Sequence, residues 1–306
     1  MMKAKAIHID AGEDELKILF IPPQNSHKAV YATALPDKLV TLYPRAKITV
    51  LGTMPAVSLF NTTPHTDRII IVDSFFEIQA LQAVFGTRWD IVVDAENLPL
   101  SALAIAKSKA RVLKNSAELP IKVYADMLGL KEGDLNPVVW LAPELVQGAA
   151  RRLFKKEHII GVAPFAADGR WVWEPENFVT LLKRLTYPGN VFPASAIAVI
   201  GFEKNRMAAN KILSELPDWQ RINLVGGLGL LSMAACIEKC RLFLGGDNLM
   251  THMAAVGNVA TLAINAMEAE VPPRGRYTEV MAKTNPSVDE TEQSVKDLWQ
   301  GKLSQK

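Results

Sequence analysis

Short apolar runs alternate with amphipathic stretches along most of the 306-residue chain, and prolines, glycines or polar residues separate them. Nearly continuous apolar runs of this length are typical of strands in a parallel sheet that is covered on both faces. In the first half the sequence predicts strands over residues 16–23, 46–53, 68–73 and 89–96. In the second half it predicts strands over residues 158–165, 195–202, 221–227, 241–246 and 259–266.

Stretches with helical spacing connect these strands. Residues 26–44 have apolar positions at helical spacing with Pro36 near their middle, so the sequence predicts a helix that is broken or restarted at this proline. Alternation of strand and helix in both halves predicts an α/β fold with two Rossmann-like parallel-sheet domains. Because parallel strands place ligands at their carboxyl ends, we expect the two domains to face each other across a cleft that holds the site.

The boundary between the halves falls on a predicted helix with a basic end. Its four basic residues either form a solvated helix face or meet an acidic membrane surface. The end of the chain is polar with one amphipathic stretch, so we expect a tail or a helix that crosses back onto the first domain. The basic residues are Arg151, Arg152, Lys155 and Lys156. The predicted organisation is residues 1–145 for the first domain, 146–157 for the linker helix, 158–280 for the second domain and 281–306 for the tail or crossover helix.

Composition narrows the class of protein. With 49% apolar and 22% charged residues, the chain is neither disordered nor fibrous. Its net charge of +2 is too small for non-specific nucleic-acid binding, so local geometry has to hold any anionic ligand. The N-terminal residues lack the apolar segment of a signal peptide, and no window has the roughly 18 apolar residues of a membrane span. We therefore expect a cytoplasmic protein.

The two cysteines, Cys236 and Cys240, are four residues apart. They are either half of a metal site or two small core residues. No further cysteine completes a thiolate cage, and His252 alone does not replace one. We therefore expect no metal site and no disulfide framework, as in a reducing compartment.

Candidate chemistry lies on loops that follow strands of the second half. Arg170 and Trp171 precede the start of a helix, where they contact a phosphate or are a surface arginine and a core tryptophan. Glu203 follows a strand, where a carboxylate accepts hydrogen bonds from ribose hydroxyls or caps a helix. Gly226 and Gly227 form a tight turn or let the backbone pass close to a planar ring, since the Walker spacing is absent.

The last of these loops has the sequence "GGDNLMTHMAA", between two apolar runs. Asn248 is a good N-cap for the following helix, and Asp247 just before it is stabilised by the helix dipole or contacts a ligand. His252 lies one helical turn later, either in the same site or as a histidine of the core.

The order of these motifs resembles the lipopolysaccharide heptosyltransferase family, glycosyltransferase family nine. The stretch "GGDNLMTHMAA" is similar to the family's D-S/T-G-x-x-H-x-A-A. Upstream, "GVAPFAADGRWVWEPENFVTLL", "AIAVIGFEKN" and "INLVGGLGLLSMAACIEKCRLFLGG" follow in the family's order, and "YPRAKITVLGT", "TDRIIIVD" and "WDIVVDAENLPLSALAIAKSKARV" are similar to its first half. The resemblance covers residues 16–266.

The resemblance implies the GT-B fold and the transfer of a sugar, typically heptose from an ADP-activated donor, with inversion and without a metal or other cofactor. It implies that Asp247, Asn248 and His252 line the donor diphosphate and sugar, and that Glu203 holds the ribose. It places the "GRWVW" loop at the leaving phosphate and the turn with Gly226 and Gly227 near the base. The partners would be a nucleotide-sugar donor and a saccharide or lipid-linked acceptor, with at most peripheral contact with the inner face of a membrane and no nucleic acid.

The sequence departs from the family at the reacting groups. The aspartate that the family uses as a base in its first loop is absent, and His27 and Lys28 stand near that position. His27 is a candidate replacement base, because the ordinary pKa of histidine is near neutrality. A leucine, Leu249, replaces a family glycine, and Trp171 rather than Arg170 occupies the position of the family's cation. The alternative is therefore a catalytically degenerate relative that acts as a binding or partner module; sugar-nucleotide epimerisation needs more acid and base groups than these loops offer.

Overall fold

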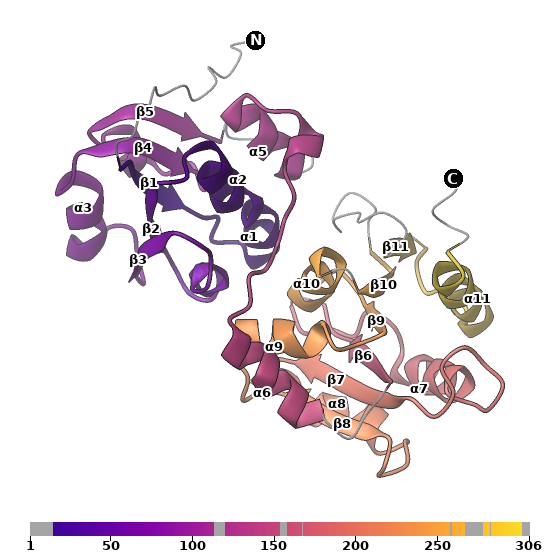
Figure 1. The fold of residues 1–306 in the computed structure, drawn as a ribbon. Coiled ribbons are helices and arrows are strands. Elements are labelled where there is room, and N and C mark those ends of the chain that lie inside the picture. Colours follow the sequence, from indigo (N-terminus) through magenta and orange to yellow (C-terminus); the bar gives the residue numbers. More distant parts are fainter. Residues whose placement is uncertain are drawn as a thin grey trace. The chain divides into compact units, whose positions relative to one another are not determined.

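The computed structural model describes residues 15–112, 120–153, 158–166, 168–257, 259–266, 278–281 and 283–301. The chain divides into two units, Met1–Trp140 and Leu141–Lys306. Each unit is built on one sheet, all of whose paired strands are parallel, with helices packed on it (Figure 1). The predicted α/β class with two parallel sheets is confirmed.

The sheet of the first unit has the strand order β3-β2-β1-β4-β5. β1 lies at its centre, and its residues Ile18 and Phe20, like Leu19 and Ile21 on the other face, are fully buried. The strands are β1 Lys17–Ile21, β2 Lys47–Gly52, β3 Thr66–Ile71, β4 Trp89–Asp94 and β5 Ala106–Arg111. The helices are α1 Ser26–Ala32, α2 Ala34–Leu42, α3 Ile78–Phe85, α4 Pro99–Ala102 and α5 Pro120–Leu128, with short 3-10 turns η1 Ala56–Phe60 and η2 Glu132–Asp134.

Local sequence explains the entry into the first helices. The Asn25 side chain accepts hydrogen bonds from the backbone N–H groups of His27 and Lys28 and so begins α1. The helix stops at Thr33 and α2 starts at once, which places Pro36 in the first turn of α2, where its missing N–H costs no helical hydrogen bond. The predicted restart at this proline is confirmed.

The fifth strand of the first unit was not predicted. β5 has the sequence AKSKAR and lies at the edge of the sheet, paired only with β4. Its two lysines are exposed, so it lacks the apolar run that marks the inner strands. Edge strands often have such charged residues, which discourage pairing with another chain.

The sheet of the second unit has the order β11-β10-β9-β6-β7-β8. Helix α7 covers it with a row of fully buried residues that includes Phe178, Leu182 and Leu185, and every residue of α10 is buried. The strands are β6 Ile159–Ala163, β7 Ala196–Gly201, β8 Arg221–Val225, β9 Leu242–Gly245, β10 Ala260–Ile264 and β11 Thr278–Met281. The helices are α6 Pro143–Leu153, α7 Pro175–Leu185, α8 Arg206–Leu213, α9 Leu230–Ile237, α10 Leu249–Val256 and α11 Val288–Trp299, with the 3-10 turn η3 Glu203–Asn205.

The first and last helices of the second unit correspond to the predicted linker helix and to the predicted C-terminal helix. The helix expected between the domains is α6, which packs against α9 within the second unit. Its basic end includes the exposed Arg151 and Arg152, whereas Lys155 and Lys156 lie outside the described residues. The amphipathic stretch near the end of the chain forms the helix α11, which packs on α7 and β10 of the second unit.

The apolar face of α11 explains where it packs. Val295 and Leu298 are buried in the core of the second unit, and the Trp299 ring lies 4.7 Å from that of Phe192. Ser287 and Glu290 form a capping box that begins the helix. The sequence pattern predicted an amphipathic helix here, but only the tertiary structure shows which core it completes.

Candidate functional site

The predicted donor-binding residues lie on loops at one edge of the second sheet. β6, β7, β8 and β9 are parallel neighbours, so their carboxyl ends lie at the same edge. Residues 164–174 follow β6, residues 202–205 follow β7, residues 226–229 follow β8 and residues 246–248 follow β9. The fold therefore gathers all four loops at the edge where parallel sheets bind ligands.

Glu203 lies directly against the glycine turn. Its carboxylate accepts hydrogen bonds from Arg206 Nε at 2.6 Å and Nη2 at 2.7 Å, and this pairing lowers the pKa of Glu203. Gly226 has a φ of +72°, and a Cβ there would collide with the Glu203 carboxylate. Gly227 has a φ of +73°, but a Cβ there would meet nothing within 4 Å. The turn after β8 thus needs glycine at both positions for its backbone, and at Gly226 also for the approach of Glu203.

The loop after β6 is a small hairpin-like turn with a charged tip. Phe165 forms an isolated bridge with Trp171, and their rings lie 4.6 Å apart, which leaves Trp171 half-buried. The exposed Arg170 donates through Nε to Asp168 at 2.6 Å, and the backbone N–H of Arg170 is the first cause of a lowered pKa of Asp168. This pair holds the arginine at the tip of the loop.

Three cations lie on the loops at this edge. A Cβ on Gly169, at the tip of the β6 loop, would lie 3.7 Å from Lys204 Cε, so Lys204 of the β7 loop packs beside that tip. Arg206 follows two residues later, next to Glu203 and Gly226. Arg170, Lys204 and Arg206 therefore belong to one polar region that is suited to a diphosphate.

The loop after β9 holds a buried histidine against an accessible aspartate. His252 Nε2 lies 3.0 Å from Asp247 Oδ1, with 1% of the His252 side chain and 33% of the Asp247 side chain exposed. Gly245 and Gly246 permit this arrangement, because a Cβ on them would collide with Thr251 and Val172 respectively. His252 thus orients Asp247 from beneath, and Asp247 is the member of the pair that a ligand reaches.

Asn248, which the sequence predicts at the donor, has a structural role in the second unit. Its Nδ2 donates to the carbonyl oxygens of Ala163 at 3.1 Å and Phe165 at 2.9 Å, and its Oδ1 accepts from Thr251. Only 3% of the residue is exposed. Because both amide hydrogens and the carbonyl oxygen are used inside the unit, the Asn248 side chain links the β6 loop to α10. Leu249 is likewise buried, so its side chain packs inward.

In the first unit, the candidate residues lie just after β1. His27 is half-buried and Lys28 is exposed, both in the first turn of α1. The structure adds a carboxylate to this loop from elsewhere in the chain: Glu96, just after β4, accepts hydrogen bonds from Gln24 through its backbone N–H at 2.8 Å and its side chain at 3.3 Å. The sequence signal for Glu96 was the motif "VVDAEN", two carboxylates at the end of a predicted buried strand. That signal points to the first loop only because β4 is the neighbour of β1 in the sheet.

The preceding carboxylate, Asp94, serves the fold. It is fully buried and accepts hydrogen bonds from three backbone N–H groups of the loop that follows β4, and also from Ser101. Arg111 lies 3.5 Å from it. These contacts order the loop that presents Glu96. Burial also raises the pKa of Tyr124, whose hydroxyl donates to the Lys28 carbonyl at 3.3 Å.

The two parallel sheets and the polar loops at the edge of the second one define a GT-B glycosyltransferase fold, and solved structures of that class match the chain over most of its length. A glycosyltransferase family 9 protein from Veillonella parvula DSM 2008 has a TM-score of 0.77 at 14% identity, covering 97% of this chain and 99% of that one. E. coli ADP-heptose lps heptosyltransferase II has a TM-score of 0.71 at 18% identity, covering 94% and 100%. E. coli heptosyltransferase WaaC, solved with ADP, has a TM-score of 0.66 at 12% identity, covering 92% and 100%.

The chain belongs to glycosyltransferase family 9 (heptosyltransferase), because the model of that family matches residues 99–296, more than half of its length. No curated protein sequence matches it. None of the helices in the described ranges combines the length and the apolar content that crossing a bilayer requires.

Proposed function

We propose that the protein is an inverting glycosyltransferase that moves a heptose-like sugar from a nucleotide-diphosphate donor, ADP-heptose being the first candidate, to a saccharide or lipid-linked acceptor of lipopolysaccharide synthesis. The observation that carries the proposal is the position of Glu203 against the Gly226–Gly227 turn, with Arg170, Lys204 and Arg206 at the same edge. A carboxylate for ribose hydroxyls beside cations for phosphates is the pattern that a nucleoside diphosphate requires.

The cations supply what a metal ion supplies in other transferases. As the bond from the anomeric carbon to the diphosphate oxygen breaks, negative charge grows on the departing nucleoside diphosphate. Positioned cations near that charge stabilise the transition state more than the ground state. We therefore propose metal-independent transfer, with Arg170 and Lys204 at the phosphates and Trp171 beside them.

Asp247 is the proposed group for the sugar. Its accessible carboxylate is oriented by the buried His252, and it lies at the edge of the sheet that also presents Glu203. A carboxylate there accepts hydrogen bonds from sugar hydroxyls and favours positive charge at the anomeric carbon. His252 acts through Asp247, as a positioning residue.

The proposed base belongs to the first unit. The acceptor oxygen forms a bond to the anomeric carbon from the face opposite the diphosphate, which inverts the configuration, and its proton passes to the base. His27 is the sequence candidate, and Glu96 is the carboxylate that the fold brings to the same loop. Lys28, exposed beside them, would hold an anionic group of the acceptor. Replacing His27 with Ala and Glu96 with Gln separately, and measuring the pH dependence of transfer, assigns the base to the variant that loses both the rate and its pH dependence.

A second candidate function rests on a specific observation. The first loop has no carboxylate of its own, and Leu249 fills the position of a family glycine with a buried side chain. These changes favour a degenerate relative that binds a nucleotide or a partner without transferring sugar. The two candidate functions share the same fold and differ in whether the protein transfers sugar.

Nucleotide binding and turnover are the tests. The melting temperature of the protein is measured with ADP, UDP, GDP, TDP and CMP, since a ligand that binds only the folded state raises it by mass action. We expect a diphosphate to raise it, and Glu203→Ala and Asp247→Ala to abolish the rise. Glu215→Ala is the matched control, because Glu215 is an exposed carboxylate paired with Lys183 away from these loops. Binding without transfer to any acceptor would favour the degenerate relative. No binding of any nucleotide would refute the glycosyltransferase and leave only a degenerate relative that binds a partner.

A further inference from the structure

Helix α3 of the first unit presents its large apolar residues outward. Ile78, Leu81 and Phe85 are 72%, 36% and 41% exposed, and their i, i+3, i+7 spacing puts them on one face. Phe76, just before the helix, is 90% exposed. The opposite face, which packs on the sheet, has only small residues, Ala80, Ala83 and Val84. We call Phe76, Ile78, Leu81 and Phe85 the α3 stripe.

Further apolar side chains extend the stripe at its neighbours. Leu103 is 70% exposed and ends α4, a helix that packs against α3. Ile105 is 54% exposed, and its carbonyl accepts a hydrogen bond from Trp89, four residues after Phe85. Exposed apolar side chains gathered on neighbouring elements in this way mark an interaction surface on a protein.

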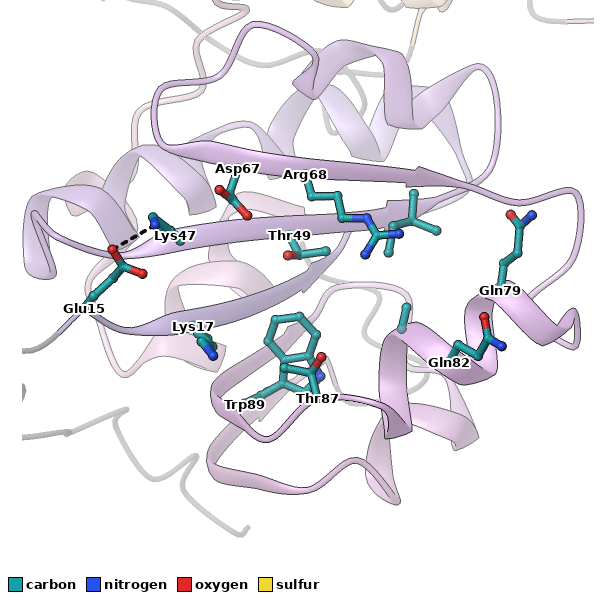
Figure 2. A pocket seen from close by; sticks show the side chains of 12 residues that line it. Glu15, Lys17, Lys47, Thr49, Asp67, Arg68, Gln79, Gln82, Thr87 and Trp89 are labelled. Atoms are coloured by element: carbon teal, nitrogen blue, oxygen red, sulfur yellow. Dashed lines mark ion pairs between the residues drawn. The ribbon is translucent and has the colours of Figure 1, made fainter.

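A polar pocket of about 440 Å³ lies on one flank of α3, over the amino-terminal half of the sheet (Figure 2). Gln79 and Gln82 line it from α3, whereas the charged side chains come from the strands and from Glu15, two residues before β1. The charged residues that line it are Glu15, Lys17, Lys47, Asp67 and Arg68.

Lys47 of the pocket is already paired, which leaves Arg68 and Lys17 as its cations for an anion. Glu15 holds Lys47 at 2.9 Å, and Asp67 acts on Lys47 as well, so both carboxylates raise the pKa of that lysine. Within the residues that the structure describes, no ion pair engages Arg68, whose guanidinium extends over the sheet from β3 (Figure 2). Lys17 lines the same pocket.

Two more cations lie beside the stripe itself. Arg88 is exposed in the turn that follows Phe85. Lys109 is exposed on β5 and donates to the Ala102 carbonyl at 2.7 Å, next to Leu103. Basic residues around an apolar helix face are the pattern of helices that lie in the interface of an anionic membrane.

We propose that this side of the first unit docks on a membrane surface that contains anionic phospholipids. The α3 stripe, Leu103 and Ile105 enter the boundary between headgroups and acyl chains, and the pocket with Arg68 receives a phosphate-bearing headgroup. The charge pattern selects a lipid surface over a second copy of the chain, which would bring Arg68, Arg88 and Lys109 against their own like charges. The inference deepens the proposed function, since it would bring the enzyme to a lipid-linked acceptor.

Vesicle binding of the full chain tests the proposal. Protein is sedimented with vesicles of phosphatidylcholine alone and with vesicles that also contain phosphatidylglycerol. We expect binding to the second kind, and the double variant Phe76→Ser, Ile78→Ser should weaken it by about tenfold or more, because it removes two exposed apolar anchors. The matched control is Met207→Ser, Tyr187→Ser, which removes apolar residues that are 87% and 70% exposed on the second unit. This control should bind like the wild type.

A separate experiment tests the pocket as a headgroup site. Arg68→Gln should reduce the preference for phosphatidylglycerol over phosphatidylcholine alone, whereas Lys211→Gln, which removes an exposed charge from α8, should leave that preference unchanged. If both variants lost the preference for phosphatidylglycerol equally, net charge and not the pocket would cause that preference. This result would overturn the assignment of the pocket as a headgroup site.

Two results would overturn the docking surface as a whole. One is wild-type protein that ignores anionic vesicles; the other is a wild-type dimer that the stripe variant converts to a monomer, which would make this side an interface between copies. The nucleotide-induced rise in melting temperature is measured on the same variants and should persist in all of them. If nucleotides did not raise the melting temperature of the wild type, the proposed function would be refuted. The vesicle result would still test the docking surface.

Discussion

Two adjacent glycines allow a sharp test of how the second unit holds a nucleotide. Gly226 and Gly227 have nearly equal positive φ angles of +72° and +73°, but only at Gly226 would a Cβ collide with the Glu203 carboxylate. Alanine at either position therefore imposes the same backbone penalty. Alanine at Gly226 additionally moves the Glu203 carboxylate from its place beside Arg206.

The backbone penalty follows from the left-handed conformation. An L-residue there costs about 1–2 kcal/mol, and restricting the unfolded chain recovers about 0.4–1 kcal/mol, so each variant should lose about 1 kcal/mol. For a unit of this size that lowers the melting temperature by about 2–4 °C. Glu203 is exposed and its side chain rotates away easily, so the collision should add little to the loss of stability in Gly226→Ala.

Ligand binding separates the two variants. If Glu203 accepts both ribose hydroxyls, displacing it should raise the dissociation constant for the nucleoside diphosphate by about tenfold to a hundredfold in Gly226→Ala. Gly227→Ala should bind like the wild type. Isothermal titration calorimetry measures the constants, and Glu203→Gln reports the loss expected from the carboxylate alone. Equal affinities in the two alanine variants would refute the role of Glu203 and the reason given for Gly226.

Three further predictions concern stability and reactivity. Asn248→Ala should lower the free energy of unfolding by about 2–4 kcal/mol, since it removes the α10 cap and two buried hydrogen bonds; a loss below 1 kcal/mol by denaturant titration would contradict the structural role. Lys283 and the cap lower the pKa of Glu290 from its ordinary 4.5 to about 2, so its stabilisation is present above pH 4.5 and is lost as the pH falls towards 2; Glu290→Gln should make the acid melting curve shallower in that window, and an unchanged curve would count against it. Burial raises the pKa of Cys236 and Cys240, so neither thiol should react with a disulfide reagent until the protein unfolds; fast labelling of the native protein would contradict this.

Much of the scaffold was predictable because it is encoded locally. Inner strands such as β1 and β9 have both faces buried and therefore consist of continuous apolar residues, which a single sequence displays. Asn25 and Ser287 begin helices through contacts within three residues, so their roles are visible in the motif itself. β5 escaped prediction because an edge strand with exposed lysines has no such pattern.

Some residues of the candidate site could be predicted from the sequence and others could not. Glu203, Asp247 and the glycine turn follow strands, so the rule that ligands bind at strand ends was enough to select them. Asn248 also follows a strand, but its side chain hydrogen-bonds to residues more than 80 positions earlier in the chain and so links two loops. Glu96 could not be selected, because its closeness to Gln24 depends on which strand pairs with β1.

The sequence by itself determined the α/β class with two parallel sheets, the inner strands of those sheets and the family, since apolar periodicity and motif order are properties of neighbouring residues. Only the tertiary structure decided that Asn248 serves the fold, that Glu96 joins the first loop, that α11 packs on the second unit and that α3 turns its large apolar residues outward. Each of these depends on pairings between distant segments. A pattern of apolar residues shows that a helix has an apolar face, whereas the packing of the whole unit decides whether that face is buried.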